Sequence, residues 1–177
     1  MDYKMGGVEL MLCILIGYIF IFFNFNIGAF NLLPDFLGYL LIVIGLSALP
    51  HKLPAFSKAR IISAVLMVLC FFRGIPFINI FFLLLFYLTY LIIYGIGEIE
   101  RTEECDLGSK NLLFWFKFLV VLQIATYLFS SLISFFFPSL EALMLFFMVL
   151  NPVMFVVFLV GLNDTRIRYR SLTDSSQ

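Results

Sequence analysis

The chain has 177 residues, of which 63% are hydrophobic and 12% are charged, and its formal net charge at pH 7 is zero. Soluble domains are about half apolar and about one quarter charged, and they avoid large exposed apolar patches. This composition, with a mean hydropathy of +1.11, excludes a soluble globular fold and indicates a polytopic helical membrane protein. The net charge of zero says nothing about partners, so only the distribution of charge along the chain is informative.

Six apolar segments follow one another along the chain, each close to the length of about 20 residues that a membrane-spanning helix needs. The predicted spans are residues 8–25, 32–49, 57–73, 77–96, 112–137 and 140–162. Pro34, Pro76 and Pro138 lie in the turns or first turns that begin the second, fourth and sixth spans. The sequence therefore predicts an all-α fold of six transmembrane helices in three hairpins.

These spans form a single predicted bundle over residues 1–163, with residues 164–177 as a disordered cytoplasmic tail, because the tail is polar. The third span is the weakest. Its apolar part covers only residues 59–72, about 21 Å as a helix. It must use its flanking residues or thin the bilayer.

Lysine and arginine residues predict the orientation, because they concentrate on the cytoplasmic side of membrane proteins. With the N-terminus inside and six spans, only Arg73 lies on the outer side. The other ten basic residues lie on or close to the inner side: Lys4, Lys52, Lys58, Arg60, Arg101, Lys110, Lys117, Arg166, Arg168 and Arg170. We therefore expect a plasma-membrane protein with both termini in the cytoplasm.

One stretch resembles a known family. Residues 31–46 read NLLPDFLGYLLIVIGL, which is similar to a hairpin of small integral membrane proteins from Firmicutes-type bacteria that have no known function. The resemblance covers this hairpin only, about a tenth of the chain. It implies a bacterial plasma-membrane location, and it transfers neither an activity nor a functional residue.

The first candidate site is a polar turn on the predicted outer side. Asn24, Asn26 and Asn31 precede Asp35, which lies in the first turn of the second span. One carboxylate with three amides suits a cation, a proton or a polar ligand at a membrane entrance. The simpler structural alternative is that the amides satisfy a tight turn and Asp35 faces a helix N-terminus.

A second candidate is a stripe of tyrosines. Tyr87, Tyr90 and Tyr94 have the spacing i, i+3, i+7, which places them on one face of the fourth span. They either line a cavity for an aromatic or amphipathic ligand or pack against neighbouring helices through their hydroxyl groups.

Small and polar residues inside the spans have a structural and a functional interpretation. Gly38 and Gly45 share one face of the second span, where small residues favour close helix packing or, alternatively, form a hinge or line a pore. Asn151 precedes Pro152 in the middle of the sixth span. A proline kinks a helix and frees a carbonyl group, and such a break forms either a substrate site or a plain kink. Thr126 is among the residues expected to bond across helices.

Catalysis has little support. The chain has no recognisable catalytic or metal-binding motif, and its three cysteines are predicted to be free thiols. We therefore predict that it is not an enzyme and takes no cofactor or metal.

The polar segment from Glu98 to Asn111 is either a solvated loop or a docking site for another protein. The basic residues beside the last span suit anionic lipids rather than nucleic acid.

Two functional classes remain open. The first is a small transporter or the substrate-binding membrane subunit of one, since six short helices resemble, in size and architecture, the substrate-capture components of vitamin-importing energy-coupling transporters. The second is a non-catalytic membrane scaffold or regulator that packs against another membrane protein.

Overall fold

The computed structural model describes residues 7–22, 32–48, 53–70, 78–136 and 141–175, and within these ranges it contains helices and no strand. The helices are α1 (Gly7–Phe22), α2 (Leu32–Ala48), α3 (Pro54–Leu69), α4 (Ile78–Thr102), α5 (Ser109–Phe136) and α6 (Glu141–Ser175). The predicted all-α fold class is thus confirmed.

Among the described helices, three are long and apolar enough to cross a membrane. The stretches concerned are Phe81–Thr102 in α4, Ser109–Phe129 in α5 and Leu145–Leu172 in α6. The apolar parts of α1 and α2 are shorter, and α3 carries Lys58 and Arg60 in its first two turns. At 1.5 Å per residue, α1 to α3 measure about 24–26 Å and α6 about 52 Å. Only α4, α5 and α6 are therefore long enough to cross a bilayer core of about 30 Å without tilt or thinning.

Two helices continue further into polar sequence than predicted. Helix α4 ends at Thr102 rather than at residue 96, and α6 ends at Ser175. The prediction of a disordered tail is therefore wrong for residues 164–175. The physical reason is that one side of this extension is buried: Thr165 is 1% exposed, Tyr169 is 3% exposed and Leu172 packs against the core.

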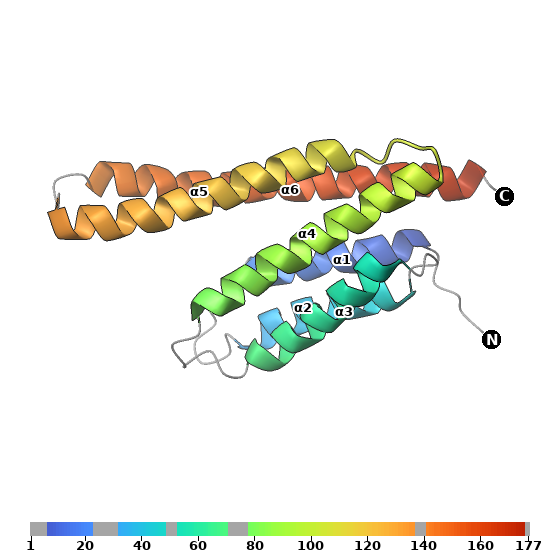
Figure 1. The fold of residues 1–177 in the computed structure, drawn as a ribbon, viewed down its shortest axis with the longest axis horizontal. Helices are drawn as coiled ribbons and strands as arrows, with labels where there is room; N and C mark the ends of the chain where they lie inside the picture. The colour runs from blue at the N-terminus through green and yellow to red at the C-terminus, as the bar shows by residue number, and fades with distance from the viewer. Residues whose placement is uncertain (1–6, 23–31, 49–52, 71–77, 137–140, 176–177) are drawn as a thin grey trace.

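The helices alternate in direction, so that the start of α1 and the end of α6 lie at the same end of the molecule (Figure 1). Each helix packs against the next one, and α6 also packs against α1. At the opposite end, α5 and α6 extend past the first four helices (Figure 1). The lysines and arginines of the described ranges all belong to the starts of α3 and α5 or to the ends of α4 and α6, which form one end of the bundle.

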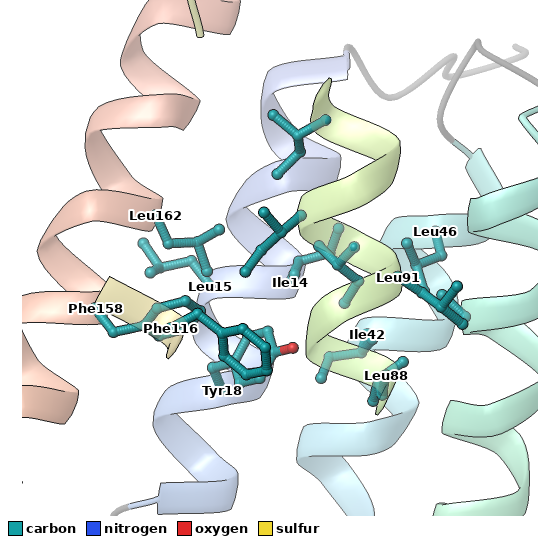
Figure 2. Packing of buried hydrophobic residues seen from close by; sticks show 14 of the residues in the cluster. Ile14, Leu15, Tyr18, Ile42, Leu46, Leu88, Leu91, Phe116, Phe158 and Leu162 are labelled. Carbon is teal, nitrogen blue, oxygen red and sulfur yellow. The ribbon is translucent and has the colours of Figure 1, made fainter. Parts of the chain in front are cut away.

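The buried core is shared by helices that are distant in the sequence. Ile14, Leu15 and Tyr18 of α1 lie against side chains of α2, α4 and α6 (Figure 2). The hydroxyl group of Tyr18 donates a 2.9 Å hydrogen bond to Oγ1 of Thr89 on α4. A buried phenol with a partner of this kind fixes the position of α4 against α1.

Candidate functional site

A partly open cavity of about 850 Å³ lies between α4, α5 and α6 at the basic end of the molecule. Its walls are the last three turns of α4, the loop that follows, the first turn of α5 and one face of α6. The lining residues are Tyr90, Ile93, Tyr94, Gly97, Glu98, Glu100, Arg101, Cys105, Asp106, Gly108, Ser109, Lys110, Asn111, Leu112, Leu113, Gly161, Asp164, Thr165 and Arg168. The cavity is therefore rimmed by charged groups and extends to tyrosines.

The α4 wall of the cavity continues the predicted tyrosine stripe. Tyr87, Tyr90, Tyr94, Glu98 and Arg101 follow one another at intervals of three or four residues, so they share one helix face. The three tyrosines are 48%, 41% and 51% exposed, so they do not pack into the bundle. Tyr90 and Tyr94 line the cavity, whereas Tyr87 does not. From Tyr90 to Arg101 the wall changes from aromatic to ionic over about 16 Å.

The loop between α4 and α5 has a defined backbone conformation. Glu104 has a φ of 51°, and the N–H group of Cys105 donates a 3.2 Å hydrogen bond to the carbonyl oxygen of Glu100. This pattern ends α4 in a Schellman-type cap. The N–H group of Gly108, whose φ is 82°, donates a 3.0 Å hydrogen bond to Oδ1 of Asp106. Two consecutive turns therefore fix the floor of the cavity.

Glu100 links the end of α4 to the start of α5. The backbone N–H group of Ser109 donates a 2.7 Å hydrogen bond to Oε1 of Glu100, and the Ser109 hydroxyl group donates to Oε2. A carboxylate at a helix N-terminus satisfies N–H groups that have no partner within the helix and interacts favourably with the helix dipole. Glu100 is therefore a structural group of the cavity.

Arg168 connects α6 to the same loop. Its guanidinium group lies 3.1 Å from Oδ2 of Asp106 and 3.0 Å from Oδ2 of Asp164. The other ionic groups on the cavity wall are Glu98, Arg101 and Lys110. None of these three forms an ion pair within the described ranges. They are the charged groups that remain available to a ligand.

The thiol of Cys105 lies on the cavity wall close to acidic side chains. Burial raises its pKa above the ordinary value of a thiol, and the carboxylates of Glu100 and Glu103 raise it further. The thiol is therefore protonated at neutral pH. Among the residues that the structure describes, no three histidine, cysteine or acidic side chains are close enough to hold a metal ion.

The predicted outer turn is only partly described. Asn24, Asn26 and Asn31 lie outside the described residues. Asp35 lies in the first turn of α2 with an exposure of 0%, and it does not line the cavity. The outer-turn site therefore stays a prediction.

Asn151 contacts α5 instead of a cavity. Its Nδ2 atom donates a 2.9 Å hydrogen bond to Oγ1 of Thr126 and a 3.1 Å hydrogen bond to the carbonyl oxygen of Phe147. Helix α6 continues through Pro152. Asn151 therefore joins α5 and α6 through a hydrogen bond, and Thr126 makes the expected bond across helices.

Sequence reasoning missed the ionic half of the cavity. The sequence predicts residues 98–111 as a solvated loop or a docking site, because charge ends an apolar span, whereas the structure has residues 98–102 in α4. The available signal was periodicity, since Glu98 and Arg101 continue the three- and four-residue spacing of the tyrosine stripe.

No family model, curated protein or solved structure matches this chain. The resemblance of residues 31–46 to membrane proteins of Firmicutes-type bacteria therefore stays a prediction, and the function has to be argued from the cavity.

Proposed function

We propose that this protein is a multi-pass membrane protein that binds an amphipathic substrate between α4, α5 and α6, as a small transporter or as the substrate-binding membrane subunit of one. The observation that carries the proposal is the α4 wall, which leads from the exposed rings of Tyr90 and Tyr94 to Glu98 and Arg101. Ligand sites typically combine apolar and aromatic walls with a few polar groups.

The proposal places all six helices in the plasma membrane, in three hairpins. Helices α1 to α3 would be short spans, and Lys58 and Arg60 of α3 would extend to the membrane surface. The described basic residues gather at one end of the bundle, which supports a cytoplasmic location of that end by the positive-inside rule. Both termini are then cytoplasmic, and the cavity opens at the cytoplasmic membrane surface.

We expect binding rather than catalysis. Burial raises the pKa of the Cys105 thiol, and the Glu100 carboxylate accepts two hydrogen bonds from Ser109. Neither group is therefore placed to act as a nucleophile or as a general base.

Native mass spectrometry after gentle purification of the full-length chain tests the proposal. We expect a small molecule or lipid to remain bound to the wild type in fixed stoichiometry. A Tyr90→Leu/Tyr94→Leu variant should lose it. Tyr127→Leu, a change at a 62% exposed residue of α5 that does not line the cavity, should keep it. Equal occupancy of both variants, or no bound molecule in the wild type, would contradict the proposal.

A second candidate function is a membrane scaffold or regulator. The end of α5 and the start of α6 extend past the first four helices (Figure 1). Large apolar side chains of these two helices are exposed, including Leu128 at 55%, Leu145 at 63% and Phe146 at 58%. A helix of another membrane protein would pack against them. Copurification of such a protein in fixed stoichiometry, with an empty cavity, favours this alternative.

A further inference from the structure

We infer that the cavity recognises the headgroup of a zwitterionic phospholipid with a primary amine, of the phosphatidylethanolamine type. This inference rests on the proposed function and names its substrate class. Three features of the wall carry it, namely a carboxylate that lacks a donor, a pair of cationic side chains, and an apolar path along α4.

The carboxylate is Glu98. Its Oε2 atom is buried and has no hydrogen-bond partner among the described residues. A buried carboxylate oxygen without a donor is unfavourable, so a ligand N–H group would stabilise it. Tyr94 lies one turn earlier on the same face, and the Tyr90 and Tyr94 ring centroids are 6.1 Å apart. Aromatic faces also attract cations. An ammonium group suits this position.

The cationic pair is Arg101 and Lys110. Arg101 follows Glu98 by three residues, which places their Cβ atoms about 5–6 Å apart. Lys110 lies in the first turn of α5, where the helix dipole also favours an anion. Guanidinium groups bind phosphate through two parallel hydrogen bonds. A phosphate joined to an amine by a two-carbon linker therefore suits the neighbouring positions of Arg101 and Glu98.

The balance of charge favours a zwitterion over a ligand of one sign. Arg168 already contacts two carboxylates, and Glu100 is bound to Ser109. A ligand with only negative charge would lie beside Glu98, and one with only positive charge would lie beside Arg101 and Lys110. A zwitterion has a partner for each of these groups.

The apolar path distinguishes a lipid from a soluble zwitterion. The face that carries Tyr90 and Tyr94 continues towards the start of α4 through Tyr87, which is 48% exposed, and Leu83, which is 67% exposed. An acyl chain can follow this exposed face while the headgroup stays at the charged end. A soluble amino phosphate would use the charged end only.

The experiment uses the full-length protein in nanodiscs that contain equal amounts of phosphatidylethanolamine, phosphatidylglycerol and phosphatidylcholine. Native mass spectrometry then counts the lipids that stay bound. We expect phosphatidylethanolamine to be retained about tenfold over the other two, because only its headgroup has an ammonium N–H group that can donate a hydrogen bond to the Glu98 carboxylate. Glu98→Gln should remove this preference, and Arg101→Gln should weaken retention of all three lipids. Glu103→Gln and Arg60→Gln, changes at exposed residues off the cavity, are the matched controls.

Each other outcome has a defined meaning. Equal retention of the three lipids by the wild type, or an unchanged preference in a folded Glu98→Gln variant, overturns the inference but leaves the proposed function in place. Displacement of the lipid by millimolar free phosphoethanolamine overturns the lipid source in favour of a soluble zwitterion. Retention of no lipid or small molecule at all contradicts the proposed function itself. If Glu98→Gln does not fold, the comparison of the three lipids on the wild type decides alone.

Discussion

Gly17 of α1 and Gly38 of α2 lie backbone against backbone. A Cβ atom on Gly17 would stand 2.6 Å from the carbonyl oxygen of Gly38, and a Cβ atom on Gly38 would stand 2.7 Å from the carbonyl oxygen of Gly17. The contact is reciprocal because the two helices run antiparallel (Figure 1). Such a close approach of two helix backbones gives van der Waals contacts that hold α1 and α2 together.

Alanine at either glycine should destabilise the protein. The added methyl group would meet backbone atoms, which cannot rotate away, so Gly17→Ala or Gly38→Ala should cost about 1–3 kcal/mol, as overpacking usually does. Gly97→Ala is the control, because its Cβ atom would lie 3.4 Å from Oγ of Ser109, an ordinary contact. Thermal unfolding in detergent should show a lower midpoint for the first two variants and an unchanged or higher one for the control. Equal midpoints for all three would contradict the packing argument.

The bond between Asn151 and Thr126 should contribute to stability and not to ligand binding. Hydrogen bonds between membrane helices contribute about 0.6 kcal/mol on average, so Asn151→Leu and Thr126→Val should each destabilise slightly. A double-mutant cycle measured by unfolding should show a coupling free energy of that size. Loss of the bound molecule in native mass spectra of Asn151→Leu would instead assign Asn151 to a ligand site.

The sequence was sufficient for the positions of the helices but not for their partners. Apolar runs predicted the positions of the six described helices, because each of these helices contains a long apolar stretch. The packing role of Gly38 followed from its spacing to Gly45, and Gly45 is buried. The opposing residue, Gly17, did not follow, because periodicity within one helix does not say which residue of another helix it faces.

Helix ends and the cavity were predicted less well, for a related reason. Hydropathy marks where a span meets water, whereas backbone hydrogen bonds continue beyond that point. Helix α4 therefore reaches Thr102 and α6 reaches Ser175. The tyrosines were found because they lie in apolar sequence. Lys110 joins them because the loop after α4 turns α5 back along α4, and Arg168 of α6 joins them because it contacts Asp106 of that loop. A one-dimensional pattern does not contain these contacts.

Arg168 should hold the end of α6 against the loop. Its ion pairs are exposed, and such pairs contribute about 0.2–1 kcal/mol. Arg168→Gln should therefore make amide hydrogen exchange in residues 164–172 and 106–108 up to about fivefold faster. In 1 M salt, the exchange rates of the wild type should approach those of the variant, because the screening length of charges is then about 3 Å. Arg60→Gln on α3 should leave these amides unchanged, and equal exchange in wild type and Arg168→Gln would show that the ion pairs do not hold α6.

Cys105 should react slowly with maleimide at neutral pH and faster as the pH rises. Burial is the main cause of its raised pKa, followed by the carboxylates of Glu100 and Glu103. The reactive species is the thiolate. In a variant with the other two cysteines replaced by alanine, the midpoint of the rate against pH should lie above about 8.5, the value of a free cysteine.

The raised pKa of Cys105 also makes the stability of the fold depend on pH. The folded state disfavours the thiolate, so the contribution of the protonated thiol is fully present below the pKa of the unfolded chain and is lost as pH rises through the higher pKa of the folded state. Cys105→Ser should remove this loss at alkaline pH. Glu103→Gln removes a carboxylate and should lower the labelling midpoint, whereas Arg60→Gln should not move it. A midpoint at or below that of a free cysteine would mean that neither burial nor the neighbouring acids disfavour the thiolate.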